Sequence, residues 1–294
     1  MKKFLNKVEA HEVESGLDKL LKESKNIGNN PDVKPATEEI SSVTGGDYVK
    51  RPNGELWNDV WFENELCIMY AAVDDVLSQS IFAVLIADEL NLTDKVLIFD
   101  LAWVQHQLVD RYSDINGQHY RFSDNLYRFE HTNHYCEFCD EMETEIRDNL
   151  EFAVKSSGAK ILIFDNLPDK CEFAYQMMQI LINLKKKYGL SVLCLVRTPK
   201  RDMSVPIEYS EYTGSMALID FCDSAVVIGK SSRGKSVRYV KQIKSRNNKI
   251  EYGSDNVVLY NIVKEDGIYL RFDFNGHGTE RDHLVKTRKK NRQK

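Results

Sequence analysis

The stretch Leu66-Cys-Ile-Met-Tyr-Ala-Ala72, followed by Val73-Asp-Asp-Val-Leu-Ser-Gln-Ser80 and Ile81-Phe-Ala-Val-Leu-Ile-Ala-Asp-Glu-Leu90, decides the fold. The first seven residues are a continuous apolar run of strand length, and residues 80–90 repeat apolar side chains at helical spacing. A strand, a short loop and a helix are the setting of a phosphate-binding loop. The loop itself does not read G-x-x-x-x-G-K-[ST], because only Ser80 matches that pattern.

Composition limits the classes of protein that remain. The chain has 294 residues and 42% hydrophobic residues, enough for one large α/β domain or two small ones with a sizeable core. The net charge of −5 excludes a global basic field, so any nucleic-acid contact must come from a local patch. No apolar run reaches the ~18 residues of a membrane span, and the basic N-terminus lacks a signal-peptide core. We therefore expect no membrane association and a cytoplasmic protein, with most of its cysteines buried as small hydrophobic side chains in a reducing compartment.

Apolar strand-like runs alternate with helical patterns through the middle of the chain. This order predicts an α/β fold with a mostly parallel sheet covered on both faces, and later hairpin-like strands add an antiparallel edge. Strands are predicted at 66–72, 95–99, 160–164, 191–196 and 224–228, helices at 80–90, 101–112, 141–156 and 173–187, and antiparallel strands at 238–243, 257–262 and 269–274.

Two polar regions divide the chain into a core and its ends. Residues 1–46 are predicted to be an N-terminal helical arm and linker, and the arm is either a frayed terminus or a helix that packs on a neighbouring subunit. Residues 47–285 form the predicted core. Residues 286–294 are a basic tail without apolar side chains, which we expect to be disordered. Such a tail is usually a solvated end, and nucleic-acid binding is the alternative.

Three groups of charged residues are candidates for chemistry. Asp165 ends an apolar strand at the edge where α/β sheets bind ligands, and it suits Mg²⁺ binding through water, although it could simply open a turn. Lys244 and Arg246 alternate on one side of a strand end. They suit a phosphate reached from a neighbouring subunit, or else they protect an edge strand from aggregation. Lys200 and Arg201 follow the fourth strand.

Together these pieces resemble the RecA-like P-loop ATPases of the RepA/DnaB helicase type. They are most similar to the AAA-family or RepA-like ATPases of Bacteroidetes plasmids and mobilisable elements. The resemblance covers residues 54–284 and rests on the joint order of its pieces. These are Gly54-Glu-Leu-Trp, Glu65-Leu-Cys-Ile, Ser80-Ile-Phe-Ala-Val-Leu-Ile-Ala-Asp, Arg111-Tyr-Ser, Ile163-Phe-Asp-Asn, Arg197-Thr-Pro-Lys-Arg-Asp, Gly214-Ser-Met-Ala-Leu, Arg238-Tyr-Val-Lys-Gln-Ile-Lys-Ser-Arg-Asn, Asp255-Asn-Val-Val and Glu280-Arg-Asp-His-Leu.

The resemblance implies a RecA-like core and assigns roles to matching residues. Asp165 would be the Walker B acid, and Ser80 the hydroxyl that binds Mg²⁺. Lys244 and Arg246 would reach the neighbouring subunit's γ-phosphate, and Lys200 and Arg201 would face DNA.

Three departures fall where the family does its chemistry. Gln79 replaces the P-loop lysine and the loop glycines are lost, Ala102 replaces the catalytic glutamate, and Arg197 replaces a histidine. The lost contact at Gln79 would weaken nucleotide binding by about 1.5–3 kcal/mol. The lost general base would slow hydrolysis by roughly 10²–10⁴. We therefore expect the degenerate loop, with Ser78, Gln79 and Ser80, to bind ATP and Mg²⁺ weakly or not at all.

A compact cluster of possible zinc ligands precedes the helix predicted at 141–156. It consists of His131, His134, Cys136 and Cys139. Zinc takes such ligands in a tetrahedron, but the usual two separated ligand pairs are absent. We interpret the cluster as a polar loop, with a zinc site as the alternative.

The expected function is that of a non-hydrolysing, DNA-associated accessory or regulatory protein in replication or mobilisation of a plasmid or mobile element. It would associate with itself or with an active RecA-like paralogue. The alternative is an active ATP-dependent helicase or motor with a divergent P-loop. A third possibility is a DNA-binding repressor on a reused fold, whose DNA affinity would be steeply salt-dependent and indifferent to nucleotide.

Overall fold

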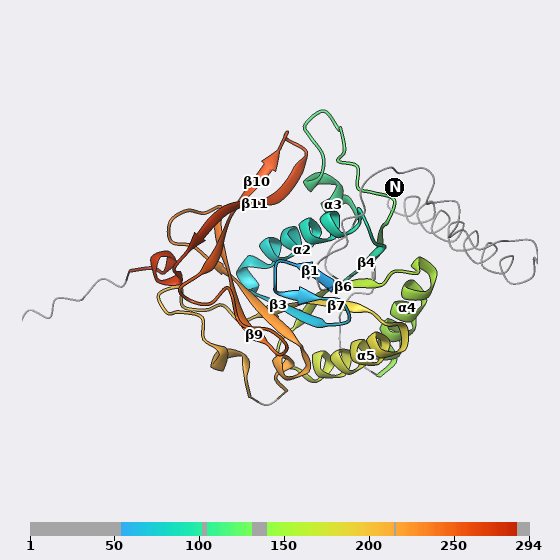
Figure 1. The fold of residues 1–294 in the computed structure, drawn as a ribbon. Coiled ribbons are helices and arrows are strands. Elements are labelled where there is room, and N and C mark those ends of the chain that lie inside the picture. Colours follow the sequence, from blue (N-terminus) through green and yellow to red (C-terminus); the bar gives the residue numbers. More distant parts are fainter. Residues whose placement is uncertain (1–53, 102–104, 131–139, 215, 287–294) are drawn as a thin grey trace, which may run out of the picture. The chain divides into compact units, whose positions relative to one another are not determined.

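A mixed sheet is the centre of the described part of the chain, which comprises residues 54–101, 105–130, 140–214 and 216–286 of a computed structural model (Figure 1). Six neighbouring strands run parallel, and three further strands extend the sheet in antiparallel order. In spatial order the strands are β11 (Tyr269–Gly278), β10 (Val257–Glu265), β9 (Val237–Ser245), β8 (Ser224–Lys230), β3 (Leu66–Ala72), β7 (Ser191–Thr198), β6 (Ile161–Pro168), β4 (Val96–Asp100) and β5 (Leu126–Glu130).

Helices cover both faces of this sheet (Figure 1). On one face, α2 (Val76–Leu90) buries Phe82 and Ile86 against the sheet. On the other face, α4 (Asp140–Ser157) and α5 (Glu172–Tyr188) bury Leu150 and Met177. Each such side chain stabilises the fold by about 1.5–3 kcal/mol. The remaining elements are the hairpin β1 (Glu55–Trp57) and β2 (Trp61–Phe62), the helix α3 (Gln105–Arg111), and the 3₁₀ helices η3 (Val73–Asp75), η4 (Tyr209–Tyr212), η5 (Leu218–Phe221) and η6 (Glu280–His283).

Two glycines are required by the local geometry. Gly189 ends α5 in the left-handed conformation, with φ of 63°, and its N–H bonds to the carbonyl of Lys185. Gly229 lies under the ring of Tyr239, and a Cβ there would stand 2.2 Å from Cζ of that ring. The close approach of β8 and β9 at this point therefore depends on the missing side chain.

The predicted α/β class, with a parallel core and late antiparallel strands, is confirmed. Three details of the prediction were wrong. α2 begins at Val76 rather than Ser80, and it buries Phe82 and Ile86 while Val84 and Leu85 are only half-buried. β5 lies between the helices predicted at 101–112 and 141–156, where the sequence predicts no strand, because its half-buried residues lack a clear apolar pattern. β6 continues past Asp165 to Pro168.

Some predictions concern residues outside the described ranges. The arm and linker at 1–46 and all of the tail except Lys286 lie there. No helix in the described part of the chain has the length and apolar character needed to cross a membrane. The carboxyl ends of the parallel strands, where α/β proteins bind ligands, lead into described loops after β3, β6, β7 and β8.

Candidate functional site

The connection between β3 and α2 is a tight turn and not an open loop. Val73–Asp75 form the 3₁₀ helix η3, and α2 begins at the next residue. No residue between Leu66 and Leu90 has a positive φ. A phosphate-binding loop uses glycines so that successive backbone N–H groups can curl around the anion. This turn therefore lacks the cradle of N–H groups that a nucleotide phosphate needs.

Gln79, which replaces the P-loop lysine, is committed to the sheet. Its side chain is fully buried, and its Nε2 donates hydrogen bonds to the carbonyl oxygens of Met69 on β3 and of Val196 on β7, the latter at 3.1 Å. These carbonyls belong to neighbouring parallel strands. The amide thus fixes the first turn of α2 to the end of the sheet and does not point toward a ligand.

A buried ion pair closes the start of α2. The guanidinium of Arg238, from β9, contacts both carboxylate oxygens of Asp75 at 2.7 and 2.8 Å, and its Nε lies 3.0 Å from the Ser78 hydroxyl. Ser78 also donates to Asp75 at 2.6 Å. The side chains of Asp75 and Arg238 are only 4% and 10% exposed. The amino end of a helix attracts anions. At the amino end of α2 this anion is the carboxylate of Asp75, from the same chain.

Asp74 forms a second, more exposed group of ion pairs beside this turn. Its carboxylate lies 3.1 Å from the Lys230 ammonium and 3.8 Å from that of Lys200, and Lys230 also donates to the Asp74 carbonyl at 2.8 Å. Burial alone raises the pKa of Asp74, but the hydrogen bond from Lys230 and the two positive charges outweigh it and hold the pKa below its ordinary value. Asp74 therefore stays ionised at neutral pH and holds Lys230 at the turn.

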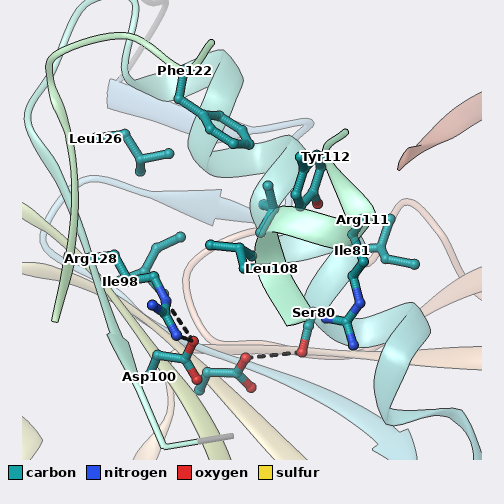
Figure 2. Close-up of a pocket in the computed structure, with 12 residues that line it drawn as sticks. Ser80, Ile81, Ile98, Asp100, Leu108, Arg111, Tyr112, Phe122, Leu126 and Arg128 are labelled. Carbon is teal, nitrogen blue, oxygen red and sulfur yellow. Dashed lines mark hydrogen bonds and ion pairs between the residues drawn. The ribbon is translucent and has the colours of Figure 1, made fainter. Parts of the chain in front are cut away.

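A second polar cluster lies at the ends of β4 and β6 (Figure 2). Asp100 and Asp165 are paired in register on these neighbouring strands, and both are buried. Ser80 donates to Asp165 at 2.9 Å, while Nε and Nη2 of Arg128 both lie 2.8 Å from one oxygen of Asp100. The pairing of β6 with β7 shifts just after Asp165, where Asn166 takes a φ of 79°. Such irregularities are common beside functional sites.

The cluster forms the polar side of a cavity of about 140 Å³ between α2, α3 and β4 (Figure 2). Arg111 also reaches this cavity; burial lowers its pKa, although Asp100 and Asp165 act in the opposite direction. Two guanidiniums and two carboxylates thus line the cavity, and Arg128 also pairs with Glu130 at 2.9 Å. The rest of the lining is apolar or aromatic and consists of Ile81, Val84, Ile98, Leu108, Tyr112, Phe122 and Leu126.

The residues fit only part of a magnesium–nucleotide site. Ser80 and Asp165 are close enough to share a cation, as the resemblance implies. The phosphate side does not fit, because Gln79 is bound to two carbonyls and Arg238 is bound to Asp75.

Among the remaining predicted site residues, Lys200 contacts the turn after β3 through Asp74 at 3.8 Å, whereas Arg201, Lys244 and Arg246 have partners elsewhere. Arg201 is folded into its own loop, where it contacts Glu211 at 3.1 Å, while the side chain of Lys200 is 75% exposed. Lys244 and Arg246 lie at the far end of β9, next to the beginning of β8. Lys244 donates to the Ile219 carbonyl at 2.6 Å, and Arg246 pairs with Asp223 at 2.9 Å. Their role toward a neighbouring subunit remains a prediction.

Other candidates fall outside the described residues. Ala102 and the possible zinc ligands His131, His134, Cys136 and Cys139 lie there. Within the described ranges, no group of three or more histidine, cysteine, aspartate or glutamate side chains has a geometry that could hold a metal ion.

Sequence reasoning missed the residues that close the site. Asp75 and Arg238 are 163 positions apart, and nothing in either local pattern indicates that they meet. Arg128 was hidden in a strand that the pattern did not predict. One signal was available in the sequence: Asp75 stands at the start of a helix, in a loop without the P-loop glycines. If such an acid is buried, it needs a cationic partner, which indicates an ion pair at this turn.

The sequence comparisons find no relative, whereas the comparison of folds finds similar solved structures. No protein-family model matches the sequence, and no curated protein matches it. Among solved structures, a KaiC-like protein from the hyperthermophilic archaeon Pyrococcus horikoshii OT3 is similar, with a TM-score of 0.49 and 10% sequence identity over 72% of this chain and 91% of that one. At this level the likeness assigns neither an activity nor a ligand to this chain.

Proposed function

We propose that this chain is a non-hydrolysing homologue of RecA-like P-loop ATPases. One observation carries the proposal: the place of the nucleotide phosphates, at the start of α2, is filled by the Asp75–Arg238 ion pair of the chain itself. An incoming phosphate would have to displace a buried carboxylate from a bidentate contact. Removing one partner of a buried ion pair costs about 3–5 kcal/mol, which is comparable to a large part of a nucleotide's binding free energy.

The chemistry of hydrolysis is also poorly supported. The sequence has Ala102 where the related ATPases have their general base. The acids that could substitute are Asp100 and Asp165, but Asp100 is paired with Arg128 and Asp165 accepts a hydrogen bond from Ser80. A general base must be able to reach the proton of an attacking water. The Ser80–Asp165 contact is nevertheless the feature that favours the alternative, an active ATPase with a divergent loop.

The wider role follows from the sequence resemblance and from exposed charge. We propose that the protein acts as a DNA-associated accessory or regulatory factor in plasmid or mobile-element replication or mobilisation, alone or with an active paralogue. Lys200 supports the DNA contact because its side chain is exposed on the loop after β7. Lys244 and Arg246 would serve a neighbouring subunit, which requires that they leave their present partners.

The test is a phosphate-release assay with ATP and Mg²⁺, in the presence and absence of DNA. We expect the rate to equal that of a matched Asp165→Asn variant, so that the signal reflects contamination or background alone. A wild-type rate clearly above that of Asp165→Asn would favour the active ATPase. For the regulatory role, mixing with an active paralogue should alter that paralogue's rate, and Lys244→Ala should abolish the effect.

A further inference from the structure

The turn between β8 and β9 borders a concave cationic surface. A hollow of about 440 Å³ is lined by Met203, by residues 230–235 and by Arg238. Its lining contains four cationic side chains, Lys230, Arg233, Lys235 and Arg238, and no carboxylate. A concave surface lined by cations, serines and a glycine has the chemistry of a phosphate site.

The four cations differ in how firmly they are held. Lys230 and Arg238 are fixed by Asp74 and Asp75, which belong to the neighbouring turn and do not line the hollow. Arg233 pairs with Asp282 at 3.5 Å, but both side chains are about 60% exposed, and such pairs are weak. Lys235 is exposed and forms no ion pair within the described ranges. Lys235 is therefore available to an incoming anion, and Arg233, whose Nε donates to the Asp282 carbonyl at 2.9 Å, presents an exposed guanidinium beside it.

The turn is held in place by the C-terminal segment. Ser231 shares a hydrogen bond of 2.7 Å with Nδ1 of His283, and the Ser232 N–H donates to the His283 carbonyl at 2.8 Å. Arg233 Nε donates to the Asp282 carbonyl at 2.9 Å. These contacts fix the backbone of the turn before any ligand arrives, which reduces the entropy lost on binding.

Two observations favour a long polyanion over a single phosphate. Lys200 and Lys230 both approach Asp74, so the exposed Lys200 lies beside the hollow. The Val285 N–H also bonds to the Met203 carbonyl at 2.9 Å, which places the start of the basic tail next to the same hollow. The sequence beyond Lys286 contains five further lysines and arginines in eight residues: Arg288, Lys289, Lys290, Arg292 and Lys294.

We propose that the β8–β9 turn binds the phosphate backbone of a nucleic acid, with Arg233 and Lys235 as the contacting side chains. The inference deepens the DNA association in the proposed function and rests on it. It does not depend on whether ATP is hydrolysed. Three neighbouring acids orient three of the cations: Asp74 holds Lys230, Asp75 holds Arg238 and Asp282 holds Arg233. A further acid, Asp202, directly precedes the lining residue Met203 in the sequence.

The experiment compares two variants of equal net charge in the full chain. Arg233→Gln/Lys235→Gln removes the proposed contacts, and Lys186→Gln/Lys249→Gln removes two exposed lysines from α5 and from the loop after β9. Binding of labelled single- and double-stranded oligonucleotides is measured by fluorescence anisotropy across a range of salt concentrations. We expect the first variant to raise Kd by about tenfold or more and to reduce the salt slope by roughly 1–2, while the control changes little.

Other outcomes would overturn the inference in distinguishable ways. Equal losses in both variants would show a non-specific charge effect. A loss with Lys200→Gln but none with Arg233→Gln/Lys235→Gln would leave the proposed DNA association standing and refute this site. If pyrophosphate bound to the protein but neither oligonucleotide did, the hollow would be assigned to small phosphates. If Arg233→Gln/Lys235→Gln weakened binding to anionic phospholipid vesicles more than binding to the oligonucleotides, the hollow would be assigned to membranes. Unchanged thermal melting would establish that both variants fold.

Discussion

Two neighbouring turns at the same edge of the sheet have opposite electrostatic character. The turn after β3 carries Asp74 and Asp75, whereas the turn after β8 is flanked by Lys230, the last residue of β8, and by Arg238 near the start of β9. β3 and β8 are paired strands, so the turns meet, and the acids of the first bind cations of the second. One set of ion pairs therefore has two effects. It occupies the start of α2, where a P-loop would hold a phosphate, and it leaves a hollow lined only by cations and neutral residues after β8.

The largest expected effect comes from separating the buried ion pair. Arg238→Met leaves the Asp75 carboxylate buried without its partner, so the free energy of unfolding should fall by about 3–5 kcal/mol. Urea denaturation measures it. Arg233→Met, which breaks an exposed pair, is the control and should change stability by less than about 1 kcal/mol. If both variants were equally mild, the pair would not close the turn as described.

The double variant Asp75→Asn/Arg238→Met sharpens this result. With no unpaired charge left in the interior, it should recover part of the stability lost in Arg238→Met. A double variant less stable than Arg238→Met would contradict the assignment of the loss to the uncompensated carboxylate.

Gln79 should contribute less, because it is neutral. Gln79→Met keeps the volume but removes both hydrogen bonds to the Met69 and Val196 carbonyls, and it should lower the free energy of unfolding by about 1–3 kcal/mol. Gln179→Met, on the exposed face of α5, should be neutral within about 0.5 kcal/mol. Equal behaviour of the two variants in denaturant unfolding would show that the amide does not tie α2 to the sheet.

The close packing of β8 against β9, just before the turn that joins them, can be tested at Gly229. Gly229→Ala places a methyl group against the buried Tyr239 ring, so we expect a loss of about 1–3 kcal/mol from overpacking. Gly253→Ala is the matched control, because a Cβ there meets no atom closer than 3.8 Å and the backbone is not left-handed. Thermal unfolding of both variants decides it, and a neutral Gly229→Ala would mean that Tyr239 can move aside.

The smallest expected effect is a pH dependence at the C-terminal segment. Burial and the charge of Arg233 lower the pKa of His283 below its ordinary value of 6.5. The unfolded chain therefore takes up this proton more readily, and the stability contributed by His283 is present above pH 6.5 and lost as the pH falls through the folded-state pKa. The free energy of unfolding of His283→Gln should decline less between pH 7.5 and pH 5.5 than that of the wild type. Parallel declines would exclude the role of His283.

The sequence allowed the sheet to be predicted, because buried parallel strands such as Leu66–Ala72 are continuous apolar runs. It failed at β5, where the five residues are all half-buried and carry no periodic signal. At the candidate site, the sequence indicated Ser80 and Asp165, which do meet, and the groups missing from the loop, but not the residues that close it. The replacement of the P-loop lysine by Gln79 can be read from the sequence motif, but the partner of Asp75 is Arg238, which comes from a distant strand. Such contacts depend on tertiary pairing, which local patterns do not contain.

The most direct test of the central claim is calorimetric titration of the wild-type protein with ATP in the presence of Mg²⁺. We predict no binding heat at millimolar ATP, because the Asp75 carboxylate already pairs with Arg238 and the Gln79 amide is bound to the carbonyls of Met69 and Val196. Saturable binding with a micromolar Kd that is lost in Asp165→Asn would contradict this prediction and would support the alternative, an active ATPase with a divergent loop.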